Sequence, residues 1–138
     1  MTRLARSYAA RPHAVGDARA AVRAWLHAAG VDALRAADVV LAVSEACSNA
    51  VMHAYAPGVD GRFRVFAEAE GDQVSVTVAD DGRGIAAARA AATSGLGLGL
   101  PLIASLADSV EARPGPDDRG TELSMRFAIH VTSHAGRH

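Results

Sequence analysis

Three polar side chains recur at helical spacing in the segment VVLAVSEACSNAVMHAY. Glu45, Asn49 and His53 are four residues apart, which places a carboxylate, an amide and an imidazole on one side of a helix in successive turns. Glu45 is the only Asp, Glu or Arg between Asp38 and Asp60, so we expect this side to face a partly enclosed cavity. These groups suit magnesium and phosphate chemistry, although the segment taken alone fits a weakly polar, solvated face equally well.

The motif DDGRG follows a segment with the alternating pattern of a strand. Asp80 is therefore expected at a strand end, where its carboxylate can accept a hydrogen bond from a ligand donor such as an exocyclic amine. Gly82 and Gly84 would let a flat ring lie against bare backbone. A β-turn with solvated aspartates is the alternative for this motif by itself.

A second glycine cluster, GLGLGLP, precedes a segment that we expect to be helical from Pro101. The free N–H groups at such a helix start can bind an anion, and tight helix packing is the alternative explanation. A dinucleotide motif is excluded because residues 100 and 102 are leucines, and a Walker A loop is excluded because the chain has no lysine. The cluster consists of Gly95, Leu96, Gly97, Leu98 and Gly99.

In this order the motifs resemble those of the histidine-kinase-like ATPase superfamily, the Bergerat fold. Its Glu-x-x-x-Asn helix, Asp-x-Gly-x-Gly turn and glycine run are followed here by Gly120 and Thr121 at the start of a closing strand. SEACSNAVMHAY is most similar to the anti-sigma-factor serine/threonine kinases, which are stand-alone ATP-binding domains. The resemblance spans residues 10–128 and implies an α/β (α+β) two-layer sandwich, with a mixed, mainly antiparallel sheet and helices on one face.

The resemblance also implies ATP and Mg²⁺ as cofactors and gives roles to single residues. Asn49 would bind Mg²⁺, Glu45 would be the general base of phosphoryl transfer, and Asp80 would receive the adenine amino group. The remaining nucleotide-binding residues would be His53 near the phosphates or a partner side chain, Gly82 and Gly84 beside the base, Gly95, Leu96, Gly97, Leu98 and Gly99 at the phosphates, and Thr121 in the adenine pocket.

By the same resemblance, the protein would phosphorylate a serine of an anti-anti-sigma factor, sequester a sigma factor and form a homodimer. The alternative function is a non-catalytic ATP-binding module that controls a protein partner by sequestration, and a regulator unrelated to sigma factors is a third possibility. The lid departs from the family pattern, since six of the nine residues between Ile85 and Gly95 are alanine and Arg89 is the only charge. A short lid would close the site less completely, which weakens the expectation of phosphoryl transfer.

The whole chain has 138 residues, which predicts one domain with its core at about 10–128 and a flexible tail at 129–138. Its net charge is -1, so it lacks the basic footprint of a nucleic-acid or anionic-membrane binder. Cys47 is the only cysteine and the N-terminus lacks an apolar signal region, so we expect a cytoplasmic protein.

The elements that must position these residues follow from the periodicity. Helices are predicted at 16–29 and at 32–55, the second with a possible break near Leu34, and a third begins at Pro101. Strands are predicted at RFRVFAEAE and VSVTVAD, joined by a hairpin at Gly71 and Asp72, and at SVEARP and ELSMRFAI. His130, His134 and His138 would belong to a frayed C-terminus.

Overall fold

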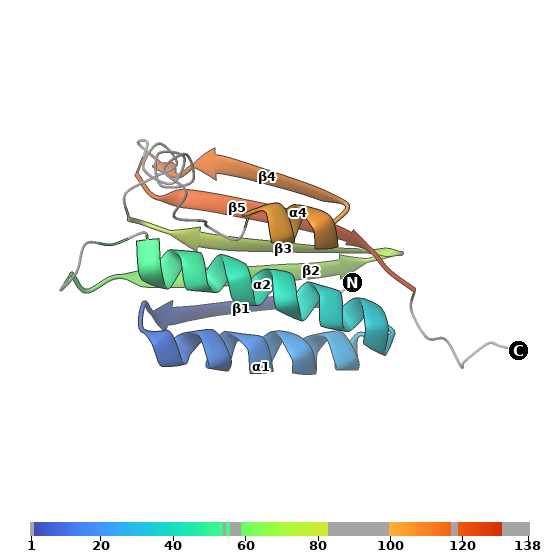
Figure 1. Ribbon diagram of the computed structural model, residues 1–138. Coiled ribbons are helices and arrows are strands. Elements are labelled where there is room, and N and C mark those ends of the chain that lie inside the picture. Colours follow the sequence, from blue (N-terminus) through green and yellow to red (C-terminus); the bar gives the residue numbers. More distant parts are fainter. Residues whose placement is uncertain (1, 54, 56–58, 83–99, 117–118, 131–138) are drawn as a thin grey trace, which may run out of the picture.

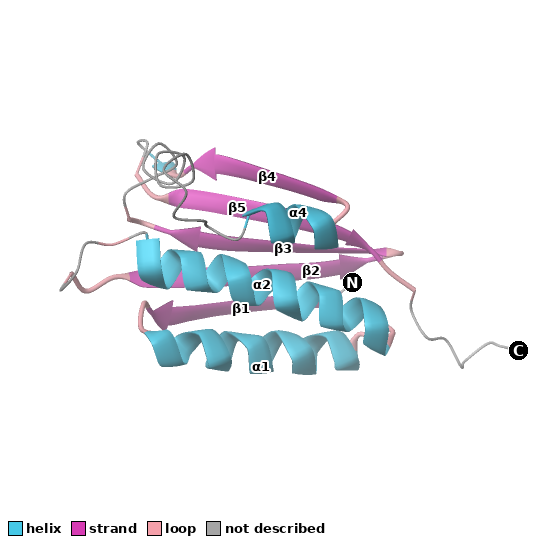
Figure 2. Ribbon diagram, viewed as in Figure 1, coloured by secondary structure: helices cyan, strands magenta, loops and turns pink. Residues whose placement is uncertain are grey.

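The computed structural model describes residues 2–53, 55, 59–82, 100–116 and 119–130. In this part of the chain, helices cover one face of a five-stranded sheet (Figures 1 and 2). The elements are β1 (Thr2–Ala9), α1 (Pro12–Ala28), α2 (Ala33–His53), β2 (Arg62–Glu70), β3 (Gln73–Asp80), α4 (Leu100–Leu106), β4 (Ser109–Pro114) and β5 (Thr121–Ala128).

The strand order is β1-β2-β3-β5-β4, and each of the four pairings is antiparallel. The predicted two-layer fold, with a mainly antiparallel sheet and helices on one face, is therefore confirmed. No parallel pair, which a mixed sheet would contain, occurs among the described strands. The hairpin between β2 and β3 also forms as predicted, with Gly71 at φ 63 beside the Glu70 and Gln73 pair.

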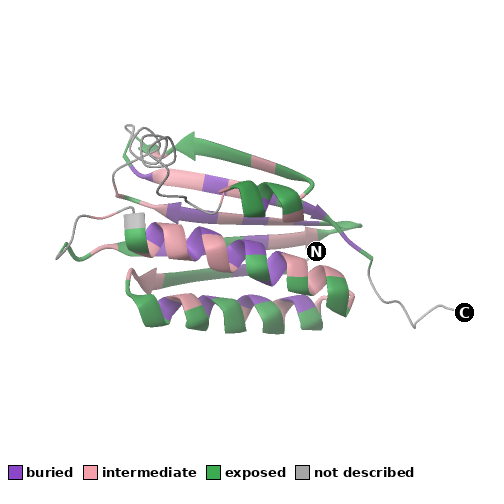
Figure 3. Cartoon of the chain, in the orientation of Figure 1, coloured by how far each residue is buried: buried purple, intermediate pink, exposed green. Residues whose placement is uncertain are grey.

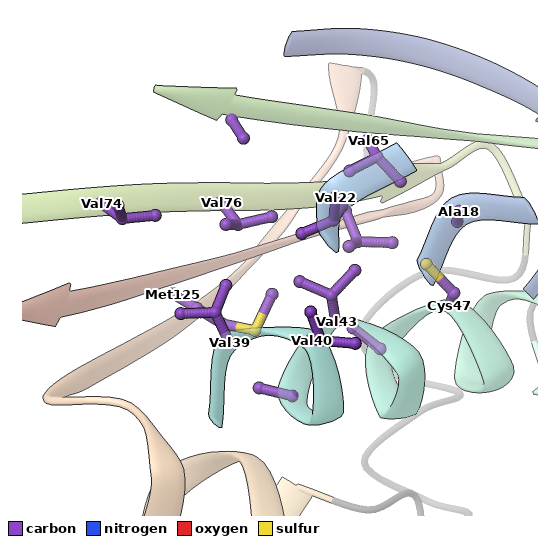
Figure 4. Close-up of a cluster of buried hydrophobic side chains, with 14 of the residues drawn as sticks. Ala18, Val22, Val39, Val40, Val43, Cys47, Val65, Val74, Val76 and Met125 are labelled. Carbon is purple, nitrogen blue, oxygen red and sulfur yellow. The ribbon is translucent and has the colours of Figure 1, made fainter. Parts of the chain in front are cut away.

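The hydrophobic core lies between the sheet and the helices, as Figure 3 shows by the buried residues on their facing sides. In strand β3, Val74, Val76 and Val78 are buried and point to the helices, and they alternate with more accessible residues. Fully burying one such side chain stabilises the fold by about 1.5–3 kcal/mol. The close-up in Figure 4 shows the contributions of each layer: Ala18 and Val22 from α1, Val39, Val40, Val43 and Cys47 from α2, and Val65, Val74, Val76 and Met125 from the sheet.

Helix α2 begins at Ala33 and continues without the break that the sequence allowed near Leu34. Asp32 caps this helix, since its Oδ1 accepts hydrogen bonds from the N–H groups of Leu34 and Arg35 at 3.0 and 3.2 Å. Leu34 thus lies in the first helical turn and points outward, with 84% of its surface exposed.

The sequence prediction omitted β1 and started α1 too late. Strand β1 pairs with β2 from Thr2 to Ala9, yet Leu4 is its only fully buried residue, so its sequence has little apolar alternation. Helix α1 begins at Pro12, which occupies the first turn, where its missing N–H costs no hydrogen bond. Among the described residues, the helices are all too short or too polar to cross a membrane.

Candidate functional site

The end of strand β3 carries Asp80 on the side of the sheet that the helices cover. Asp80 continues the alternation of the buried Val76 and Val78, and in the sheet register it lies opposite Thr121, the first residue of β5. Two residues predicted for the base pocket are therefore direct cross-strand neighbours. Cross-strand neighbours on one face have their Cβ atoms about 5 Å apart, close enough for both side chains to contact one ligand.

The carboxylate of Asp80 is half-buried and held by backbone groups. Its Oδ1 accepts a hydrogen bond from the Gly82 N–H at 2.9 Å. Burial raises the pKa of the Asp80 carboxyl above its ordinary value of 3.8, against the opposing effect of hydrogen bonds from the Gly82 and Thr121 N–H groups. The nearby Asp81 charge raises this pKa further, and Arg64 lowers it. A partly desolvated and oriented carboxylate of this kind is suited to accept a hydrogen bond from a ligand.

Gly120 allows β5 to start close to this carboxylate. It has φ 74, and a Cβ added to it would lie 1.9 Å from the carbonyl oxygen of Asp80. Its N–H donates a hydrogen bond to the Gly82 carbonyl at 3.2 Å. Both the positive φ and the short distance to Asp80 therefore require glycine at this position. Because Gly120 lets the start of β5 approach the end of β3, Thr121 lies opposite Asp80.

The polar stripe of α2 lies at the border between buried and exposed helix surface. Glu45 and Asn49 are half-buried, and neither side chain has a hydrogen-bond partner within the described ranges. On one side the stripe is bordered by small buried residues, Ala42 and Ala46, and on the other by exposed apolar residues such as Met52. Among the described residues, no side chain or backbone group is hydrogen-bonded to this carboxylate or this amide.

The C-terminal end of α2 and the end of β3 meet at the same end of the molecule (Figure 1). Tyr55, two residues beyond the helix, accepts a hydrogen bond from the Asp81 N–H at 3.0 Å. Asn49 lies one helical turn before His53, the last residue of α2, a rise of about 6 Å. The structure therefore brings the Glu45 and Asn49 helix face and the Asp80 turn to one end of the sheet.

Comparison with known proteins decides the family. The family model for the histidine kinase-like ATPase domain matches residues 8–127. The chain belongs to this ATPase family. This confirms the resemblance drawn from the motifs at Glu45, Asn49, Asp80 and the glycine run.

Two anti-sigma factors and one solved structure are also similar to this chain. The anti-sigma F factor of Clostridium beijerinckii is 46% identical over 48 residues, and that of Pasteuria penetrans is 49% identical over 49 residues. Each alignment covers 35% of this chain, and 34% and 33% of the two relatives. The crystal structure of the RsbU and RsbW domains of Rv1364c from Mycobacterium tuberculosis matches 94% of this chain and 33% of that one, with a TM-score of 0.74 and 29% identity. The chain thus aligns with about a third of the length of these relatives.

Several residues predicted for this ATPase site lie outside what the structure describes. His53 is the last residue of α2, but its side chain is not among the described ones. The second glycine of the turn, the lid and the phosphate-binding run also lie outside the described residues, so their roles stay predictions. These residues are Gly84, Arg89, Gly95, Leu96, Gly97, Leu98 and Gly99.

Sequence reasoning missed two residues beside the predicted base pocket. Arg64 forms a two-pronged ion pair with Asp81, with N···O distances of 2.9 and 3.1 Å. The Tyr55 hydroxyl contacts the backbone of both Arg62 and Asp81. The two adjacent aspartates of DDGRG could have predicted an arginine partner. Nothing in the sequence indicated the contacts of the Tyr55 hydroxyl.

A hollow of about 600 Å³ lies elsewhere on the domain, between α1 and α2. Arg19, Arg23 and His27 line it from α1, and Val40 and Leu41 line it from α2. None of the predicted nucleotide-site residues is part of its lining, so it is separate from the site at the end of β3.

Proposed function

We propose that this chain is an ATP-dependent anti-sigma-factor kinase, which transfers the γ-phosphoryl group of ATP to a serine of an anti-anti-sigma partner. The observation that carries the proposal is the half-buried Asp80 carboxylate at the end of β3, opposite Thr121, in a member of the histidine kinase-like ATPase family. Similarity to two anti-sigma F factors and to a structure that includes an RsbW domain supports the anti-sigma assignment.

Asp80 would recognise the adenine base. An ionised carboxylate only accepts hydrogen bonds, and the exocyclic amine of adenine is a donor. Gly82, whose N–H already orients the carboxylate, would lie beside the base with Gly84, and Thr121 would complete the pocket. The glycine run at residues 95–99 would approach the phosphates with its backbone N–H groups.

Asn49 would bind Mg²⁺ together with oxygens of the phosphates and water. Mg²⁺ prefers oxygen ligands and often takes few of them from protein, so a single half-buried amide oxygen without a described hydrogen-bond partner fits this ion. When bound, the ion would neutralise phosphate charge and polarise the γ-phosphoryl group.

Glu45 would act as the general base, one helical turn before Asn49. Its carboxylate would take the proton of the partner's serine hydroxyl while the serine oxygen forms a bond to the γ-phosphorus. The bond between that phosphorus and the bridging oxygen breaks, and ADP leaves with the bonding electron pair. Within the described residues, no hydrogen bond or ion pair engages the Glu45 carboxylate, which is consistent with this role.

The same phosphoryl transfer would control the binding of protein partners. The chain would sequester a sigma factor in the cytoplasm, act as a homodimer, and release the sigma factor when an unphosphorylated anti-anti-sigma protein binds. The alternative is a non-catalytic module, in which ATP only shapes a partner-binding surface. The short, alanine-rich segment between Ile85 and Gly95 favours this alternative.

The test is a phosphotransfer assay with radiolabelled Mg-ATP and the anti-anti-sigma proteins of the same genome. We expect phosphoserine on one of them, and we expect Glu45→Gln to slow transfer by about 100- to 10,000-fold without changing Mg-ATP affinity. Glu70→Gln, at the far end of β2, is the matched control and should transfer at the wild-type rate.

An anti-anti-sigma protein that binds the ATP-loaded chain and stays unmodified would contradict the kinase proposal. If Glu45→Gln then still sequesters and releases its partner normally, the non-catalytic module is the correct function.

A further inference from the structure

The hydroxyl of Tyr55 contacts three backbone groups at the edge of the proposed adenine pocket. It donates a hydrogen bond to the Arg62 carbonyl at 2.5 Å, and it accepts hydrogen bonds from the N–H groups of Arg62 at 3.3 Å and Asp81 at 3.0 Å. A tyrosine hydroxyl has one donor and two acceptor positions, so this one is saturated.

These are three of the four backbone groups that the next hydrogen-bonded pair of the β2–β3 ladder would use. The last pair of that ladder is Phe63 with Asp80, so Arg62 and Asp81 would form the next antiparallel pair. The Tyr55 hydroxyl binds Arg62 and Asp81 in place of the hydrogen bonds that these two residues would otherwise make to each other. The ladder therefore ends at Asp80. The direction of the chain at residue 81 is therefore determined by a side chain from the end of α2.

Two further contacts hold this arrangement in place. The Tyr55 ring lies against Gly61, where an added Cβ would come within 2.4 Å of ring atoms. The side chain of Asp81 is bound by Arg64 in a two-pronged ion pair. Both the backbone and the side chain of residue 81 are thus fixed, and the peptide that joins it to Asp80 is fixed with them.

We propose that Tyr55 is a positioning residue for base recognition, which holds Asp80 at the angle that selects adenine over purines without the exocyclic amine. This inference rests on the proposed function, since it requires Asp80 to contact the base. A hydrogen bond to a base depends steeply on angle, so a small rotation of the Asp80 backbone would weaken recognition of the amine more than binding of the phosphates.

The test compares the affinities for Mg-ATP and Mg-ITP, which differ in the exocyclic group of the base, by calorimetric titration. Tyr55→Phe keeps the ring against Gly61 and removes only the hydroxyl. We expect its ATP affinity to fall about tenfold and its ITP affinity to change less than twofold, so that the preference for ATP falls about tenfold. Tyr8→Phe, on β1, is the matched control and should keep the wild-type preference, because its ring still stacks on Phe63 and its hydroxyl makes no hydrogen bond within the described residues.

Gly61→Ala provides a second variant if Tyr55→Phe does not fold, because the added methyl group must displace the Tyr55 ring. It should also lower the ATP preference. Unchanged preference in whichever of these variants folds would overturn the inference, even if thermal stability is reduced.

Asp80→Asn separates failure of this inference from failure of the proposed function. If wild type prefers ATP and Asp80→Asn loses that preference while Tyr55→Phe keeps it, then Asp80 reads the base and Tyr55 does not position it. If Asp80→Asn keeps the wild-type preference, the proposed contact between Asp80 and adenine is itself wrong.

Discussion

At the scale of single residues, the Asp80 carboxyl shows how the fold prepares a recognition group. Burial opposes its ionised form, while the Gly82 and Thr121 N–H groups favour that form. The folded chain therefore holds the carboxyl proton to a higher pH than the unfolded chain does. Such a group reduces stability once it ionises.

This shift predicts a pH dependence of stability. As the pH rises from 3.8 through the raised pKa of Asp80, the wild type should lose stability relative to Asp80→Asn, because only the wild type must ionise a half-buried carboxyl. Urea unfolding of both proteins between pH 4 and 7 measures this difference, which should grow with pH and then level off. A difference that shrinks with rising pH would mean that the folded state favours the ionised form.

At the same scale, Glu45, Asn49 and Asp80 could be predicted as site residues because their types and spacing carry chemistry, and Thr121 was predicted from the family resemblance. The sequence could not identify Tyr55, since a tyrosine after a helix is common and the partners of its hydroxyl are backbone groups of distant residues. Backbone contacts leave no mark in residue types, so this part of the site required the structure.

At the scale of elements, Arg35 joins the start of α2 to the ends of α4 and β5. Its guanidinium donates hydrogen bonds to the carbonyls of Ala128 and Leu106 at 2.9 and 2.8 Å, and pairs with Asp38 and Asp108. It also lies over the Phe127 ring, 5.3 Å from the centroid. The helix that follows the glycine run is thus tied to the helix that carries Glu45.

We predict that Arg35→Ala lowers the free energy of unfolding by about 3 kcal/mol, because two carbonyls and two carboxylates lose a charged donor. Arg23→Ala on α1 is the matched control, since no ion pair of Arg23 occurs within the described residues, and it should cost less than about 0.5 kcal/mol. Chemical denaturation of both variants measures the effect. Equal, small losses would show that the Arg35 contacts add little.

The elements also show why some of the fold was predictable. The β2–β3 hairpin and the body of α2 follow from strict periodicities and from Gly71, so local pattern was sufficient. Strand β1 forms by pairing with the edge of β2. Its sequence, TRLARSYA, has almost no alternation of buried and exposed residues from which a strand could be predicted. Pairing between distant segments is a tertiary effect that single-sequence periodicity does not contain.

At the scale of the whole molecule, one end of a two-layer domain holds the described residues that are proposed to recognise the base. Strand β3 ends there at Asp80, β5 starts there at Thr121, and the Tyr55 hydroxyl binds the turn after β3 from beyond the end of α2. The family match to residues 8–127 assigns this domain to the histidine kinase-like ATPases. The central claim is that Mg-ATP binds at this end with its base against Asp80.

The most direct test of this claim is calorimetric titration of Mg-ATP into the wild type and into Asp80→Ala, with circular dichroism to check that both fold. We predict one site in the wild type, with an affinity at least tenfold weaker in the variant, because a charged hydrogen bond to the base contributes about 1.5–3 kcal/mol. Equal affinity in both folded proteins, or no binding to folded wild type, would contradict the claim.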